Sequence, residues 1–140
     1  MTPRIHDLAV GTELPVRTIT VDRQVLIDYA TASGDANPIH QDEEFARSVG
    51  LPDVIAHGMW TMGSAVEVVT DWVGDPGRVV SCSTRFTNPV VVPAEGGAAI
   101  EVTGSVKSLD RESSRVAVEL TVTSGGAKVL GRATAVVDLG

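Results

Sequence analysis

The segment 59–73 constrains the fold most, because apolar side chains cover much of its helical circumference. Its two charged residues, Glu67 and Asp71, offer only a sparse polar stripe. Such a helix has no broad polar face to turn toward water, so we expect it to be largely buried. Four β-rich segments separated by turn clusters follow it, at about 78–92, 98–109, 115–123 and 128–138. One long buried helix followed by an antiparallel meander predicts an α+β fold in which the sheet wraps the helix.

The segments before this helix are shorter. Residues 12–21 carry several β-formers and are predicted as a first strand or extended arm. Between 22 and 34 apolar residues recur at three- and four-residue spacing, which predicts a helix, and a short acidic-started helix is predicted over 42–47. The chain contains no linker, repeat or low-complexity block, so we expect residues 1–140 to form a single domain.

The loop between these two helices, residues 33–40, has the sequence SGDANPIH. Pro38 fixes its own φ and pushes Asn37 into an extended conformation. Asp35 and His40 are therefore expected on a stiff, irregular segment, which is what precisely held proton-transfer groups require. The same residues could also form an ordinary helix-terminating turn, because Gly, Asn and Pro are common turn formers.

A second segment, 54–65, has the sequence VIAHGMWTMGSA. Together the two segments resemble the signature of the MaoC-like hydratases and dehydratases, the R-specific enoyl-thioester hydratase family of the hot-dog fold. The residues that fall on family positions are Asp35, Asn37, His40 and Gly58. With 72–77 and 106–108, the chain most resembles the catalytic B-type subunit of heterodimeric (3R)-hydroxyacyl-ACP dehydratases of mycolic-type fatty acid elongation. The resemblance covers essentially the whole chain and implies an antiparallel sheet wrapped around a long central helix.

The resemblance implies a hydro-lyase that needs no cofactor and acts on an acyl thioester, carried by acyl carrier protein (ACP) or by CoA. Asp35 and His40 would hold the catalytic water between them. In the dehydration direction His40 would remove the Cα proton, and the departing hydroxyl would be protonated through Asp35 or the shared water. Two groups of moderate basicity aimed at one water can perform both proton transfers. The sequence does not divide these roles between the two residues.

Four further residues are candidates for substrate binding or for support of the site. Gly58 lies where the chain enters the long helix, so its N–H and the helix dipole can point at the thioester oxygen. Asn37 is expected to brace the loop by hydrogen bonds, and His57 to shape the turn before the helix. Thr61 can hydrogen-bond either into the site or to the backbone of its own helix.

Composition and charge limit the possible partners and cellular locations of the protein. The net charge of −7 argues against general nucleic-acid binding. No apolar run approaches the ~18 residues of a membrane span, and the first residues lack the apolar region of a signal peptide. The single cysteine, Cys82, suits a reducing cytoplasm, where we expect the protein to act. A sheet covered by one helix has exposed edges, so we expect a hetero- or homodimer with another hot-dog subunit.

Several alternatives stay open. A homodimeric R-specific enoyl-CoA hydratase carries the same loop, and a non-catalytic acyl-binding partner subunit has the same fold. Hot-dog thioesterases also bind acyl thioesters, but they typically lack the loop. A metal site is the obvious rival, although the spacing of its candidate ligands matches no zinc motif, so we expect none. Those candidate ligands are Asp35, His40, His57 and Asp42. Nucleophilic catalysis has less support, because Ser33 and Cys82 have no recognisable adjacent base.

Overall fold

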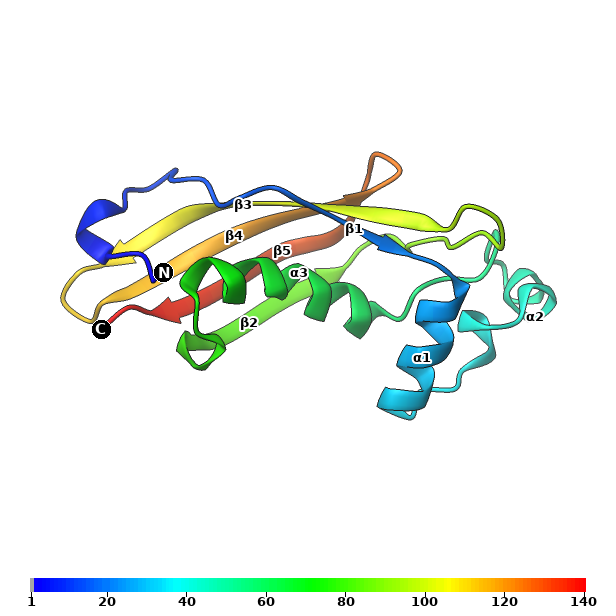
Figure 1. The fold of residues 1–140 in the computed structure, drawn as a ribbon. Helices are drawn as coiled ribbons and strands as arrows, with labels where there is room; N and C mark the ends of the chain where they lie inside the picture. The colour runs from blue at the N-terminus through cyan, green and yellow to red at the C-terminus, as the bar shows by residue number, and fades with distance from the viewer. Residues whose placement is uncertain (1) are drawn as a thin grey trace.

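The computed structural model describes residues 2–140. In chain order its strands and longer helices are β1 (Arg17–Val21), α1 (Arg23–Ser33), α2 (Glu43–Ser48), α3 (Gly58–Val73), β2 (Val79–Phe86), β3 (Ala98–Asp110), β4 (Arg115–Ser124) and β5 (Ala127–Asp138). The strands form one antiparallel sheet in the order β1-β3-β4-β5-β2, and α3 lies along one face of it (Figure 1). The predicted α+β arrangement of a long helix against an antiparallel sheet is confirmed.

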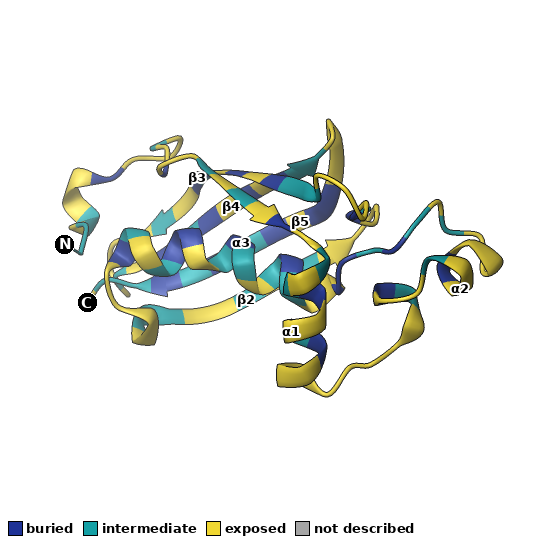
Figure 2. Ribbon diagram, turned by 45° about the vertical axis from the view of Figure 1, so that its right-hand side comes forward, coloured by how far each residue is buried: buried dark blue, intermediate teal, exposed yellow. Residues whose placement is uncertain are grey.

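One face of the sheet forms the core. In β4, Val116, Val118 and Val122 are fully buried, whereas Glu119 and Thr121 between them are exposed. Side chains alternate between the two faces of a strand, so this period of two separates a dry face from a wet one. Dark blue and yellow alternate along the sheet for the same reason (Figure 2). The buried face packs against α3 and closes the hydrophobic core.

Helix α3 is only partly buried, which differs from the expectation of a largely buried helix. Val69 and Val73 face the sheet and are fully buried. Met59 is 59% exposed, and Trp60 and Trp72 are partly exposed. A single sheet can cover only one side of a helix, so residues 2–140 leave the apolar residues on the other side of α3 partly uncovered.

The sheet also departs from the predicted meander at β2. This strand ends at Phe86 and not at residue 92, because Pro89 offers no N–H to a strand ladder. Beyond it, Val91 forms an isolated bridge with Ile55. The strand itself lies at the sheet edge beside β5, so only β3, β4 and β5 follow one another as a meander.

Helices α1 and α2 fall where the sequence predicts them. The Asp22 carboxylate accepts the N–H of Val25 at 2.9 Å and caps α1, and Gly34 ends the helix with a left-handed φ of 78°. The Asp42 carboxylate caps α2 by accepting the N–H of Phe45 at 3.1 Å. Gly34 and Asp42 therefore fix the two ends of the loop between the helices. Both helices lie at one end of the sheet (Figure 1).

Two expectations at the level of the whole chain can be compared with this structure. The predicted first strand over 12–21 is shorter, since β1 begins at Arg17 and the segment before it forms only an isolated bridge, from Glu13 to Ser105, with neighbouring backbone hydrogen bonds to β3. Across residues 2–140, the helices are too short or too polar to cross a membrane.

Candidate active site

The loop after α1 is braced by its own side chains. The N–H of Asn37 donates to the Asp35 carboxylate at 3.2 Å, and the Asn37 side-chain oxygen accepts the N–H of Ile39 at 3.2 Å. Pro38 then begins a 3₁₀ turn that ends at His40. Asn37 therefore makes the bracing contacts that the sequence leads one to expect, and the loop has little freedom between Asp35 and His40.

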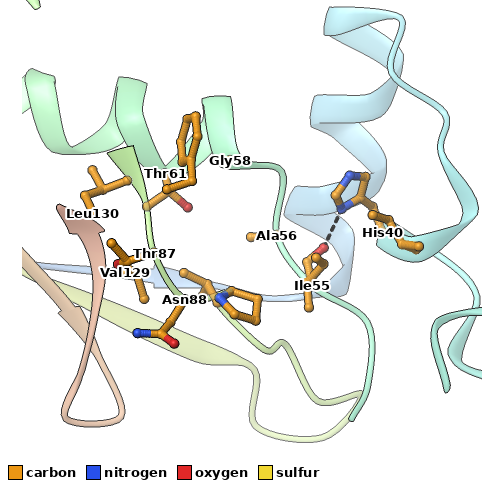
Figure 3. Close-up of a pocket in the computed structure, with 13 residues that line it drawn as sticks. His40, Ile55, Ala56, Gly58, Thr61, Thr87, Asn88, Val129 and Leu130 are labelled. Atoms are coloured by element: carbon orange, nitrogen blue, oxygen red, sulfur yellow. Dashed lines mark hydrogen bonds between the residues drawn. The ribbon is translucent and has the colours of Figure 1, made fainter. Parts of the chain in front are cut away.

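His40 is buried, and a backbone carbonyl fixes which of its ring nitrogens carries the proton. Its Nδ1 lies 2.7 Å from the carbonyl oxygen of Ile55 (Figure 3). A carbonyl can only accept, so Nδ1 donates its proton and Nε2 keeps a free lone pair. The N–H of Ile55 also donates to the Ile39 carbonyl at 3.1 Å, so Ile55 holds both the ring and the backbone of this turn. A neutral imidazole with a free Nε2 can act as a general base.

The surroundings of His40 also favour the neutral ring. Burial is the largest influence and lowers the pKa of His40 below its ordinary value of 6.5, and the neighbouring His57 lowers it further. The bond to the Ile55 carbonyl and the Asp35 carboxylate act in the opposite direction without reversing the shift. A base must be unprotonated to work, so this direction suits proton abstraction near pH 7.

His57 connects the two ends of the loop. Its Nε2 lies 3.0 Å from the backbone carbonyl of Asp35, and its ring stacks on that of His40 with centroids 3.8 Å apart and planes 23° apart. Tyr29 covers it with a ring centroid 4.7 Å away. Within residues 2–140, its buried Nδ1 has no hydrogen-bond partner. His57 thus contacts both the Asp35 backbone and the His40 ring, at the two ends of the loop.

Asp35, His40 and His57 come close enough to raise the question of a metal. A side-chain ligand atom of each lies within 4.8 Å of the other two. A metal ion binds a histidine nitrogen at ~2.1 Å along a lone pair in the plane of the ring. The two rings are stacked almost in parallel, so an ion in the plane of one lies well outside the plane of the other. The fourth candidate, Asp42, caps α2. This geometry does not suit a metal and brings together an acid and a base.

Two cavities meet beside this cluster. A largely apolar one of about 320 Å³ is lined by His40, Ile55, Gly58, Thr61 and Phe86 among others (Figure 3). A second of about 480 Å³ is lined by Asp35, His57, Gly58 and Phe86 among others. Gly58 and Phe86 belong to both, so a ligand in the first cavity that passes Gly58 and Phe86 lies beside both His40 and Asp35.

Gly58 is the first residue of α3 and lies where the cavities meet. No side chain caps this end of the helix, and its first intrahelical bond is from the Thr61 N–H to the His57 carbonyl at 3.2 Å. The preceding N–H groups therefore have no partner inside the helix and are available to an oxygen atom. A Cβ on Gly58 would lie 3.0 Å from the Phe86 ring. The Thr61 hydroxyl lies 3.5 Å from the His57 carbonyl, the second of the two roles expected for it.

Three parts of the site carry no signal in the sequence. Ile55 contributes through its backbone groups, so its residue type gives no sign of this role. Phe86 comes from the edge strand β2, and pairing of distant strands brings it to Gly58. Tyr29 fits the apolar spacing of α1, so the sequence pattern marks it as a core residue while the structure places it against His57.

Comparison with known proteins identifies this architecture. Residues 7–125 match the family model described as "MaoC like domain". A 3-hydroxybutyryl-CoA dehydratase from Methylorubrum extorquens is 33% identical over 127 residues, which are 89% of this chain and 77% of the relative. The peroxisomal enoyl-CoA hydratase 2 of Arabidopsis thaliana is 45% identical over 60 residues, 41% of this chain but only 19% of that protein.

A solved structure gives the same result in three dimensions. A chain described as a MaoC-like dehydratase superposes with a TM-score of 0.97 and 46% identity, over 99% of this chain and 43% of the other. The fold is therefore the expected hot-dog, and the resemblance in the sequence is confirmed at the level of the family. This chain belongs to the MaoC-like dehydratase family.

Proposed function

We propose that this chain is a hydro-lyase that interconverts (3R)-3-hydroxyacyl and trans-2-enoyl thioesters. The observation that carries the proposal is His40, whose Nδ1 is bound to the Ile55 carbonyl and whose Nε2 is left free beside an apolar cavity. A carboxylate oxygen of Asp35 lies within 4.8 Å of a ring nitrogen of His40. The family relatives named dehydratase and hydratase support the same reaction type.

In the dehydration direction the proton moves from Cα to His40 Nε2. The electrons of the C–H bond form the new Cα=Cβ bond, and the Cβ–O bond breaks. The leaving hydroxide is protonated through Asp35 or the water that Asp35 and His40 share, and departs as water. The proton that His40 has taken then replaces the one given up, so both groups return to their starting state. Hydration runs through the same steps in reverse, with that water attacking Cβ.

Negative charge builds on the thioester oxygen as the Cα proton leaves. The N-terminus of α3 offers N–H groups without intrahelical partners, and Gly58 permits close approach of the substrate because it has no side chain. Donors placed at a developing oxyanion stabilise the transition state more than the ground state, and losing one typically costs about 10²–10³ in turnover. We assign this role to the backbone around Gly58.

The finer part of the proposal is that the chain is the catalytic subunit of a hydroxyacyl-ACP dehydratase and pairs with a second hot-dog subunit. Met59 is 59% exposed and Phe86 54% exposed, both beside the second cavity, and β2 forms a sheet edge. A partner seated there would cover these apolar side chains and pair with the free strand edge. A homodimeric enoyl-CoA hydratase would satisfy the same surface with a second copy of this chain.

One set of assays separates these possibilities. The purified chain, alone and co-expressed with a hot-dog partner that lacks the Asp–His pair, is given matched enoyl and 3-hydroxyacyl thioesters on CoA and on ACP. Chiral chromatography identifies the hydroxyacyl product, and sedimentation gives the assembly state. We expect the (3R) product, with the highest activity in the heterodimer on long acyl chains.

Each other outcome has a definite meaning. A homodimer fully active on short enoyl-CoA and unaffected by any partner would favour the homodimeric hydratase. No turnover of any thioester, by the chain or by its assemblies, would leave the non-catalytic acyl-binding subunit as the better account. The (3S) product would contradict the assignment of R specificity.

A further inference from the structure

Arg23, the first residue of α1, makes three hydrogen bonds to three other segments. Its Nε donates to the Val92 carbonyl at 2.6 Å, and one terminal nitrogen donates to the carboxylates of Glu43 and Asp53, each at 2.9 Å. The Arg23 side chain is 21% exposed and that of Asp53 is 17% exposed. Sequence patterns give this residue no role, since it opens a predicted helix like many arginines.

All three acceptors of Arg23 flank the segments that hold His40. Glu43 follows His40 by three positions and begins α2. Asp53 precedes Ile55 by two positions, and its carboxylate also accepts the N–H of Val54 at 2.7 Å. Val92 donates its N–H to the Val54 carbonyl at 2.8 Å. The guanidinium therefore ties the chain after His40 to the chain before Ile55, which are the two sides of the Nδ1 to carbonyl bond.

We propose that Arg23 is a positioning residue that keeps His40 hydrogen-bonded to the Ile55 carbonyl. This inference rests on the proposed function, in which His40 Nε2 takes the Cα proton. A planar guanidinium with donors in fixed directions can hold three acceptors at set distances, which a flexible ammonium cannot. Displacement of a catalytic group by about 1 Å can cost on the order of 10²-fold in rate, so a clamp of this kind affects turnover without touching substrate.

Arg47 provides a matched control. Its guanidinium lies 3.7 Å from the Glu43 carboxylate and 3.9 Å from that of Asp53, the same two groups that Arg23 binds. The Arg47 side chain is 58% exposed. Exposed ion pairs at such distances contribute little, so removing Arg47 changes the charge near the site without releasing the clamp.

The first test reads the His40 ring directly and needs no activity. Histidine ring nitrogens are followed by ¹H–¹⁵N NMR through a pH titration in the wild type, Arg23→Ala and Arg47→Ala. The bond to Ile55 stabilises the protonated ring, so its loss lowers the pKa of His40 further. The groups that face His40 are Asp35 and His57, with Tyr29 behind His57, and neither substitution removes any of them.

We expect Arg23→Ala to weaken the Nδ1–H signal and lower the pKa of His40, with Arg47→Ala like the wild type. An unchanged signal and titration in folded Arg23→Ala would overturn the positioning role. So would the same change in both variants, because it would trace to charge alone. Both outcomes are independent of whether the protein turns over any thioester, so failure of this inference can be told from failure of the proposed function.

The second test is kinetic. Arg23→Ala should lower kcat by about 10–100-fold with KM within about threefold, because the substrate pocket keeps its lining while the base loses its place. Arg47→Ala should keep kcat within about twofold. Arg23→Lys keeps a positive charge for Glu43 and Asp53 if the alanine variant fails to fold. We expect Arg23→Lys also to lose at least about tenfold in kcat, and wild-type kcat in it would contradict the clamp.

Discussion

The hydrogen bond from His40 to the Ile55 carbonyl decides which ring nitrogen can take a proton. The sequence supplies a histidine on a stiff loop, but the tautomer comes from a backbone oxygen 15 positions away. Stacking on His57 then limits rotation of the ring. In the proposed mechanism, proton transfer by His40 therefore depends on two groups that themselves transfer no proton.

The lowered pKa of His40 predicts a particular pH dependence. In the proposed mechanism dehydration needs neutral His40, so kcat/KM should stay level above pH 6.5 and fall only on the acid side of that value. Stability should follow the same direction. The unfolded chain, with the higher pKa, takes up the proton first as pH falls, so the free energy of unfolding decreases below pH 6.5. Initial rates and urea unfolding over about pH 5–8 test both expectations, and an acid limb centred above pH 7 would contradict them.

Gly58 gives a second prediction at this scale. In Gly58→Ala the new Cβ would lie 3.0 Å from the Phe86 ring, tighter than ordinary contact, so the ring or the helix start must shift. We expect kcat to fall by about tenfold or more through displacement of the N–H groups. Adding Phe86→Leu should recover part of the loss by making room. No recovery in the double variant would mean that the glycine serves something other than this contact.

Individual residues show which parts of the site the sequence could predict and which it could not. Asp35 and His40 lie on a motif with proline-restricted geometry, so their proximity follows from a few neighbouring positions. Phe86 reaches Gly58 only through the pairing of β2 with β5, and Arg23 meets Asp53 across 30 positions of chain. Local patterns cannot reveal contacts of that range, because many distant partners would satisfy the same residue.

At the level of elements, the turn 93–97 joins the segment after β2 to the start of β3. Gly97 has φ of 60° and stands beside the last residue of β1, where a Cβ would lie 2.5 Å from the Val21 carbonyl oxygen. Gly96 has φ of 81°, but a Cβ there meets nothing within 4 Å. The two neighbours share the left-handed backbone and differ in the space around them.

Alanine substitutions at these positions should therefore differ in stability. Gly96→Ala pays only the left-handed conformation, about 1–2 kcal/mol. Gly97→Ala must also push β1 and β3 apart, so we expect at least about 2 kcal/mol more. Urea unfolding of both variants measures the difference. Equal midpoints would show that the turn yields without disturbing the pairing of Val21 with Ala98.

The elements also show which patterns predict structure well. Capping residues and apolar spacing place α1 and α2, because both signals are local to the helix. The alternation in β4 likewise reports directly on burial of one face. Burial of α3 is overestimated for a different reason, since apolar side chains on all sides require cover but do not say that the same chain provides it.

At the scale of the whole molecule, the strand order is the feature that the sequence pattern misses. Period-two alternation indicates that a strand has one buried face. It does not indicate which strand lies beside it, because any neighbour in the sheet is compatible with the same pattern. The meander of β3, β4 and β5 follows from short turns, whereas β2 crosses to the far edge beside β5. That placement leaves β2, which ends at the exposed Phe86, at a free edge of the sheet near the exposed Met59. The proposed second subunit would bind at this edge.

The central claim is that Asp35 and His40 act as one unit on one water. Its most direct test is kcat for Asp35→Asn, His40→Ala and the double variant in the active assembly, with circular dichroism to establish that each folds. We predict a loss of about 10²–10⁴-fold for each single variant, and a double variant no slower than the worse of the two. Near-normal turnover by either folded single variant, or losses that multiply in the double variant, would contradict the account.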